Sequence, residues 1–465
     1  MRRRDFLQKS AGALATLSFV SSASRQALGQ SPSPTDLLSL SSPSRNRAFA
    51  KEFSDTGISI LQGLTESHRA QFSILHAEPQ IFCRVIDSQG ETLTGLRQTD
   101  FRESSDNSIK VEKWQIADLH LGEIYQLQIF NGAGEKLDER KFRSFDDKKI
   151  GLRIAVASCM EDSPSKLLFQ GEMWQALWAT EPELLFLIGD SCYTDVDGPA
   201  TPEILFRRFA TSRKLFALYR AKQLIPTLAL WDDHDFGANN SGRDYPHKDF
   251  SAQNFLGFFA QDPWQVSSGE SSLARGPSLS HTLRAGGLRL HMMDCRTNRA
   301  PKRASENCVH WGAEQEDWLF AQLETAQPSL ILNGSQFFGG YFPATEAFQS
   351  NHPDNFESVL ARFRKSPSPV VLISGDIHYS EVMRLSPADM GYETLEITSS
   401  GMHSFLLPLR GTIGNSRRIA GRNKNNFSLI TVQPNSPEKL EVEVTSYGQG
   451  GVIWYQHRQV IDRGV

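Results

Sequence analysis

The sequence predicts an α/β protein with buried sheets covered by helices, preceded by a small antiparallel β-sandwich, Ig-like or similar. From about residue 58 to 145, short alternating runs bounded by turn residues, as in "IYQLQIFNGAG", are typical of antiparallel strands. After "DDKK", continuous apolar runs alternate with helix-like segments. Strands made of such runs are buried on both faces, so helices should cover their sheets.

The N-terminal residues predict an export signal rather than folded structure. Arg3-Arg4 followed by Phe6-Leu7 resembles a twin-arginine signal, and residues 10–24 carry no charge. That stretch is short of the roughly 20 apolar residues that span a bilayer, so we expect cleavage after residue 29 rather than an uncleaved anchor. The protein would then be periplasmic or extracellular, with no transmembrane segment in its mature form. Residues 30–55, rich in Ser, Pro and Arg, are typical of a linker or leader.

Composition limits the classes of partner. The chain has 465 residues, 39% of them apolar and 22% charged, which suits a soluble globular protein of about two domains. The formal net charge is −4 and no long basic run occurs, so nucleic acid is an unexpected partner. The five cysteines are widely spaced without a CxxC pair, which excludes a disulfide framework and a zinc-finger pattern. We expect a monomer.

The expected elements are as follows, in chain order. The β domain covers residues 56–148 and shows no cluster of reactive side chains, so we interpret it as a structural or positioning module. In residues 149–465 the expected apolar strands alternate with helices, and one more strand is expected near the C-terminus. The apolar runs expected to form strands lie within 154–159, 184–190, 226–230, 288–296, 329–336, 370–381 and 439–448, and the helices are expected at 165–179, 202–221 and 312–324.

Six of these strands end in the same way, with a polar side chain of a type that can bind a metal or a substrate. Sites in open α/β sheets form outside the carboxyl ends of the strands, so these groups could meet at one rim. One such residue would mean little, because acids often cap helices or make turns. The groups are Cys159, Asp190, Asp233 with His234, Asp294 with Arg296, Asn333 to Gln336, and Asp376 with His378.

The stretch "LWDDHDFGANN" places three carboxylates around His234, and bound cations could neutralise that charge. Asp190, Asp233 and Asp376 are hard oxygen donors suited to calcium, magnesium or manganese. A thiolate, a phenolate and an imidazole, from Cys159, Tyr193 and His378, suit a more Lewis-acidic ion such as ferric iron. Two cations sharing one carboxylate would clamp a phosphoryl group and activate a water. His234 would then protonate the leaving oxygen.

A set of short motifs resembles the PhoD-like alkaline phosphatases of the metallophosphoesterase superfamily. The resemblance covers roughly residues 153–401 and extends more loosely over the preceding β domain. It implies a four-layer α/β/β/α sandwich with two mixed sheets, preceded by an Ig-like domain. The motifs, in chain order, are "ASC", "GDSCY", "WDDHDFGANNSG", "DCR", "WGAEQEDWL", "GSQ", "SGDIHYSE" and "ITSSG".

By that resemblance the iron ligands are Cys159, Asp190, Tyr193 and His378. Asp190 would bridge to a calcium held also by Asp233 and Asp376, with His234 as the general acid. Gln336 matches the remaining ligand position, although Asn333 lies only three residues away. Arg296, and Asn239 or Asn240, could contact phosphate or a second calcium. The sequence departs from the family at Cys192, where an aliphatic residue is usual, and in the short segment 299–307.

Other interpretations of the same residues stay open. His234 could satisfy a core hydrogen bond, Cys159 could be a small buried apolar group, and Tyr193 could simply pack. Asp232 and Asp235 are more typical of capping or orienting residues than of direct ligands. The chain is thus expected to hydrolyse small phosphomonoesters or phosphodiesters. The alternative is a non-catalytic metal-binding envelope protein whose β domain binds a partner; a serine hydrolase is disfavoured because no GxSxG turn occurs.

Overall fold

The computed structural model describes residues 52–163, 167–264, 271–302, 308–339, 346–407 and 414–464. All of them belong to one compact unit, Ser41–Val465. The expected signal, residues 1–29, and all but the last residues of the expected linker, 30–55, lie outside the described part of the chain. Among the described helices, none is long and apolar enough to cross a membrane.

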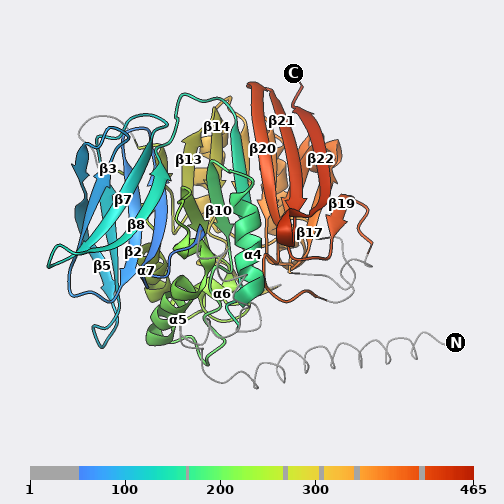
Figure 1. Cartoon of the computed structure of the whole chain (residues 1–465). Helices are drawn as coiled ribbons and strands as arrows, with labels where there is room; N and C mark the ends of the chain where they lie inside the picture. The colour runs from blue at the N-terminus through green and yellow to red at the C-terminus, as the bar shows by residue number, and fades with distance from the viewer. Residues whose placement is uncertain are drawn as a thin grey trace. The chain divides into compact units, whose positions relative to one another are not determined.

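Eight antiparallel strands, β1 to β8, form what we call the β module (Figure 1). They make two sheets of four, in the orders β1-β2-β6-β5 and β4-β3-β7-β8, with one apolar core that includes Phe72, Trp114 and Phe142. The alternating sequence pattern therefore predicted the strand type correctly. The strands are β1 (Ser59–Thr65), β2 (Ala70–His76), β3 (Ile81–Ile86), β4 (Thr92–Thr94), β5 (Leu96–Glu103), β6 (Lys110–Ile116), β7 (Ile124–Asn131) and β8 (Lys136–Arg143).

Two larger sheets of mixed direction make up the rest of the fold. The six-stranded sheet has the order β11-β10-β9-β20-β21-β22, and the eight-stranded sheet has the order β12-β13-β14-β15-β16-β18-β17-β19. The first contains β9 (Leu152–Ala157), β10 (Leu184–Ile188), β11 (Thr227–Leu230), β20 (Phe427–Ser436), β21 (Lys439–Tyr447) and β22 (Ile453–Asp462). The second contains β12 (Leu273–Arg275), β13 (His281–Ala285), β14 (Leu288–Met292), β15 (Ser329–Leu332), β16 (Val370–Ser374), β17 (Ser380–Leu385), β18 (Thr394–Thr398) and β19 (Arg418–Arg422).

The expected helices form at the expected places, and further helices that were not predicted join them. The run at 202–221 divides into α5 and a 3-10 turn, η2, where Phe216 leaves the helical conformation. The helices are α4 (Leu167–Trp178), α5 (Pro202–Leu215), η2 (Ala217–Arg220), α6 (Asp233–Phe236), α7 (Lys248–Phe258), α8 (Ala313–Leu323), α9 (Phe348–Asn351), α10 (Pro353–Phe363), α11 (Pro387–Met390) and η4 (Gln449–Gly451).

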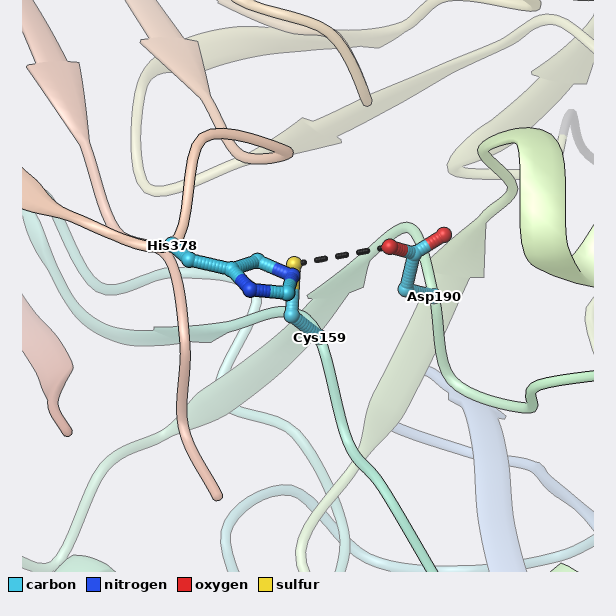
Figure 2. A group of neighbouring side chains, drawn as sticks. All are labelled: Cys159, Asp190 and His378. Atoms are coloured by element: carbon cyan, nitrogen blue, oxygen red, sulfur yellow. Dashed lines mark hydrogen bonds between the residues drawn. The ribbon is translucent and has the colours of Figure 1, made fainter. Parts of the chain in front are cut away.

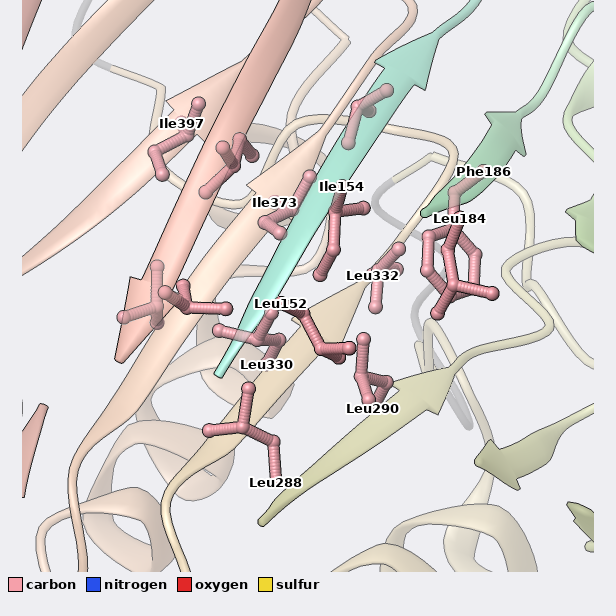
Figure 3. Close-up of a cluster of buried hydrophobic side chains, with 14 of the residues drawn as sticks. Leu152, Ile154, Leu184, Phe186, Leu288, Leu290, Leu330, Leu332, Ile373 and Ile397 are labelled. Carbon is pink, nitrogen blue, oxygen red and sulfur yellow. The ribbon is translucent and has the colours of Figure 1, made fainter. Parts of the chain in front are cut away.

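The main core lies between the two large sheets. Side chains of β9 and β10, such as Ile154 and Phe186, pack against Leu290 and Leu332 of β14 and β15 (Figure 3). A second cluster joins the other face of the eight-stranded sheet to α8 and α10. Each fully buried aliphatic side chain contributes about 1.5–3 kcal/mol relative to an exposed one. These cores therefore contribute most of the free energy of folding, and the residues at the ends of the strands need not add to it.

Two buried arginines fasten the β module to the rest of the chain. The guanidinium of Arg213, on α5, donates to Ser59 Oγ at 2.9 Å, to the Ser73 carbonyl at 2.8 Å and to the Phe258 carbonyl at 2.8 Å. In the other direction, Arg140 of β8 donates to the Ala221 carbonyl at 2.7 Å. A planar guanidinium suits such convergent contacts. The β module is therefore fixed by directional bonds as well as by apolar contact.

Candidate metal centre

The residues predicted from strand ends do gather where parallel strands stop. Strands β9, β10 and β11 run parallel in one sheet, as do β14, β15, β16 and β18 in the other. The loops after β9 and β10 are tied together, because the Cys159 amide donates to the Gly189 carbonyl at 3.2 Å. Gly189 has φ +94°, and a Cβ there would lie 2.6 Å from Asp232 Cβ, so glycine permits this approach.

Several of these residues hold an unusual backbone conformation. Cys159, Asp190, Asp376 and His378 have φ values of 56°, 51°, 70° and 51°, and Asn240 has 63°. A left-handed conformation of a residue with a side chain costs of order 1–3 kcal/mol and persists only where the surroundings enforce it. Five of the nine described non-glycine residues with positive φ lie at this rim, which makes the rim a candidate functional site.

The first group of possible ligands comprises Cys159, Asp190 and His378 (Figure 2). One ligand atom from each lies within 4.8 Å of the other two. Cys159 Sγ lies 3.5 Å from Asp190 Oδ2, and the Tyr193 hydroxyl lies 3.3 Å from His378 Nε2. Ser400 braces this group, since its Oγ accepts from the His378 amide at 2.7 Å and lies 3.3 Å from Cys159 Sγ. The four residues expected to bind iron are thus brought together.

The second group comprises Asp190, Asp233 and His234, so Asp190 belongs to both groups. His234 Nδ1 lies 2.8 Å from Asp195 Oδ1, and the His234 ring centroid lies 4.4 Å from that of Tyr193. The other oxygen of Asp195 accepts from the Asn239 amide at 3.0 Å. Asp195 therefore fixes the orientation of the imidazole and leaves Nε2 as the ring atom that can face a reactant.

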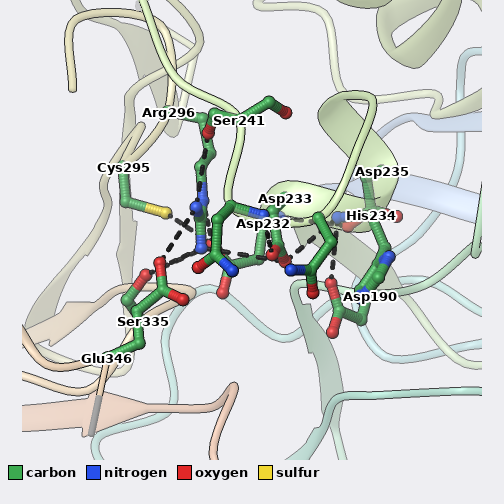
Figure 4. Close-up of polar contacts among 12 residues, drawn as sticks. Asp190, Asp232, Asp233, His234, Asp235, Ser241, Cys295, Arg296, Ser335 and Glu346 are labelled. Atoms are coloured by element: carbon green, nitrogen blue, oxygen red, sulfur yellow. Dashed lines mark hydrogen bonds and ion pairs between the residues drawn. The ribbon is translucent and has the colours of Figure 1, made fainter. Parts of the chain in front are cut away.

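The third group comprises Asp232, Asp233 and Asp376. The Arg296 side chain contacts two of these acids (Figure 4). Its Nε donates to Asp232, and one terminal nitrogen lies 3.7 Å from Asp233 Oδ1. The other terminal nitrogen lies 3.3 Å from Glu346 Oε1. Arg296 is fully buried, so it serves here as a fixed positive charge among acids.

Burial and crowding perturb the ionisation of the acids. Burial raises the pKa of Asp190 and of Asp376, and neighbouring carboxylates raise both further. Burial alone would also raise the pKa of Asp233, but Arg296 and His234 outweigh it and lower this pKa. Burial would lower the pKa of His234, but Asp233 and Asp190 raise it to about 10. Burial, followed by the Asp190 carboxylate, raises the pKa of the Cys159 thiol.

The residues present fit a pair of neighbouring cations. Several carboxylates are crowded together in a buried space, and Asp232 Oδ2 is buried with no hydrogen-bond partner among the described residues. One group offers sulfur, nitrogen and oxygen atoms, while the third offers oxygen only. Such donor sets favour different metals. A cation in each place would offset both the burial and the carboxylate repulsion that raise the pKa values of Asp190 and Asp376.

Other predicted residues have structural contacts. Gln336 is buried, and its Nε2 donates to Glu381 at 2.8 Å and to Thr398 at 3.2 Å; its Oε1 has no partner among the described residues. Its role as a ligand stays a prediction. Asn333 Oδ1 accepts from Trp311 Nε1 at 2.9 Å. Both therefore take part in bonds that hold the loop after β15.

Three further residues of the rim form hydrogen bonds that hold neighbouring segments together. Asp235 forms a capping box with Asp232 at the start of α6 and accepts from Ser191, as expected for a capping residue. Cys192 is buried, and its Sγ accepts from Ser212 Oγ at 3.5 Å. Asp294 accepts from Trp231 Nε1 at 2.7 Å, so it holds the loops after β11 and β14 together.

Sequence reasoning missed Asp195, Glu346 and the bracing role of Ser400. Asp195 lies two residues after Tyr193 and carries no signal of its own, since its partner His234 is 39 residues away. Ser400 belongs to the quoted "ITSSG" motif, which could have pointed to it. Glu346 lies in a segment without any motif, and only the fold brings it to Arg296.

Comparisons with known proteins agree with this geometry. The family model described as PhoD-like phosphatase matches residues 154–425, more than half of the chain. A solved structure described as "Structure of PhoD" is similar at 17% identity, covering 88% of this chain and 92% of that one with a TM-score of 0.64. No curated protein matches this chain. The chain therefore belongs to the PhoD-like phosphatase family, whose members are metal-dependent phosphoric ester hydrolases.

Proposed function

We propose that this chain is an exported hydrolase of small phosphate esters that uses iron and calcium, with His234 as its general acid. The observation that carries the proposal is the position of Asp190. Its carboxylate belongs both to the group with Cys159 and His378 and to the group with Asp233 and His234. One carboxylate between two unlike donor sets is the arrangement that a bridged pair of different cations requires.

Cys159, Asp190, Tyr193 and His378 would hold ferric iron, and Asp190, Asp233 and Asp376 would hold calcium. Gln336 completes the ligand set that we propose from the family resemblance. When bound, the two ions would neutralise the acids, clamp the phosphoryl group and activate a water for in-line attack on phosphorus.

The chain supplies the proton for the leaving group. With Nδ1 held by Asp195, His234 presents Nε2 toward the reactants and donates its proton to the departing alcohol oxygen. Packing against the Tyr193 ring limits rotation of the imidazole. Arg296 is held by Asp232 and Glu346 at the same rim, where it adds positive charge for the phosphate.

The test is hydrolysis of p-nitrophenyl phosphate and bis-p-nitrophenyl phosphate by protein loaded with iron and calcium. His234→Ala should lower kcat by about 10²–10⁴-fold with the bound metals retained. His457→Ala, a change on the outer strand β22, is the matched control. Bound ions without turnover by the unaltered protein would instead favour the non-catalytic envelope protein, and full turnover by His234→Ala would remove its assigned role. The ratio of the two substrate rates decides between monoester and diester preference.

The export route and domain limits complete the proposal. Residues 1–29 would direct export through the twin-arginine route, which carries folded proteins, and residues 30–55 would link to the Ig-like domain at 56–148 and the four-layer catalytic domain at 149–465. Replacing Arg3-Arg4 by Lys-Lys should block export, measured by fractionation. Unchanged secretion of that variant would refute the route.

A further inference from the structure

One exposed aromatic side chain, Phe405, packs against a candidate metal ligand. Its ring meets the His378 ring edge to face, with the two centroids 4.6 Å apart and the planes at 75°. Phe405 is 41% exposed, whereas His378 is 6% exposed, so the phenyl ring presents apolar surface to solvent beside a buried ligand. A single exposed apolar side chain is ordinary on a protein surface, and only its position gives this one a meaning.

Phe405 stands at one end of a row of rings that leads to the candidate general acid. His378 Nε2 lies 3.3 Å from the Tyr193 hydroxyl, and the Tyr193 ring centroid lies 4.4 Å from that of His234. The three inner rings are buried, and Phe405 is the exposed member of the row. An organic group attached to a phosphate at the metals can therefore meet this row at the phenyl ring.

The loop after β18, which carries Phe405, is fixed to the loop after β9. The Met402 amide donates to the Ser158 carbonyl at 2.9 Å, and His403 Nδ1 lies 3.0 Å from the Glu161 carbonyl oxygen. The loop after β9 also carries a candidate iron ligand. The exposed ring and the metal centre are therefore held in register by the same pair of loops.

Asparagines in the turn between β19 and β20 hold the other side of this loop. Asn425 Nδ2 donates to the carbonyls of Gly401 and Ser404, both at 2.8 Å, and Asn423 Nδ2 donates to the Leu407 carbonyl at 3.0 Å. These bonds lie before and after the exposed ring in the chain. A backbone that is already fixed loses little freedom when a ligand binds, which favours contact with the ring.

We propose that Phe405 is a specificity-determining residue that packs against the apolar organic group of the ester whose phosphate occupies the metal centre. The inference rests on the proposed function, because it assumes a phosphate at the metals. The contact buries apolar surface on both partners, and a ring in the substrate adds an aromatic pair. The protein would thus favour phosphate esters of ring-bearing apolar alcohols or phenols over esters of small polar alcohols.

The experiment measures binding without turnover. Metal-loaded protein is titrated calorimetrically with phenylphosphonate, methylphosphonate and inorganic phosphate. Phenylphosphonate should bind more tightly than methylphosphonate, and Phe405→Ala should reduce the ratio of the two affinities by about 3–10-fold, the range for one aromatic contact. Inorganic phosphate has no organic group, so its affinity should stay the same in this variant.

Matched variants separate contact with the ligand from mere shielding of His378. Phe405→Tyr keeps the ring and should keep the phenyl preference. Phe82→Ala removes the other well-exposed phenylalanine among the described residues, on β3 of the β module, and as the control should change nothing. A phenyl preference that survives Phe405→Ala would overturn the inference. So would an equal loss of affinity for all three ligands, because that is the result that shielding alone predicts.

Hydrolysis of p-nitrophenyl phosphate by the same preparations keeps this inference apart from the proposed function. Turnover without any phenyl preference would refute the contact and leave the catalysis standing. A phenyl preference that depends on Phe405, in a protein that hydrolyses no p-nitrophenyl ester, would instead refute the proposed catalysis and support the contact.

Discussion

Removing metal from the protein should make its stability fall as the pH rises. In the metal-free fold, burial raises the pKa of Asp235 from 3.8 to about 7. Between these values the folded chain binds more protons than the unfolded chain, so the free energy of unfolding decreases with increasing pH. The pKa of His234 is raised from 6.5 to about 10 by carboxylates that outweigh its burial, and this also makes stability fall, between pH 6.5 and 10.

The size of the effect can be worked out from linkage. Because each pKa unit corresponds to about 1.4 kcal/mol, Asp235 alone should cost roughly 2–3 kcal/mol between pH 5 and pH 8. Asp190 and Asp376 also have raised pKa values and add loss in the same direction. Since whole domains are stable by about 5–15 kcal/mol, a loss of this size should be easy to detect.

The assay is chemical denaturation of chelated and of iron- and calcium-loaded protein at several pH values. Metal should stabilise more at pH 8 than at pH 5, because bound cations favour the ionised carboxylates. Asp190→Asn removes one of the crowded acids and should flatten the pH dependence of the metal-free protein. A metal-free protein whose stability is constant or rises between pH 5 and pH 8 would refute the electrostatic reasoning.

Three further outcomes are expected. Asp190→Asn should lower the content of both metals, measured by mass spectrometry, whereas Cys159→Ser should lower iron only; equal losses in both variants would contradict a shared carboxylate. Asp195→Asn should leave metal content intact but lower kcat by about 10–100-fold, and an unchanged rate would show that His234 needs no partner. Arg213→Ala should cost about 3–5 kcal/mol in unfolding free energy, because several buried carbonyls lose their donor, and a loss below about 1 kcal/mol would show that apolar packing alone holds the β module.

Many of the candidate ligands could be predicted from the sequence because each of them follows a strand closely in the chain. Strand β10 is followed by one glycine and then by Asp190. Strand β16 is likewise followed by one glycine and then by Asp376. The apolar run predicts a buried strand, and parallel strands place the residues at their carboxyl ends along one edge. The local pattern indicated that Cys159, Asp190 and His378 could share one rim, and the family resemblance assigned them to one metal ion.

The contacts that orient the side chains of the site could not be predicted from local sequence patterns. Asp195 and His234 are 39 residues apart, and Arg296 and Glu346 are 50 apart. These pairs depend on how loops cross, which no periodicity encodes. The position of β20 beside β9 is similar, since nearly the whole catalytic part of the chain separates the two strands. Local patterns indicated β9, but they predicted neither β20 nor its place beside β9.

Two independent costs converge on the same few residues. Cys159, Asp190, Asp376 and His378 all take the left-handed backbone conformation, and Asp190, which is buried, and Asp376, which is half-buried, also lie among like charges. Packing alone would select against both features, and the large cores between the sheets need neither of them. A ligand that binds only the folded chain and carries positive charge offsets both costs at once. The strain and the buried charge therefore have one common explanation, in which the cations belong to the folded state itself.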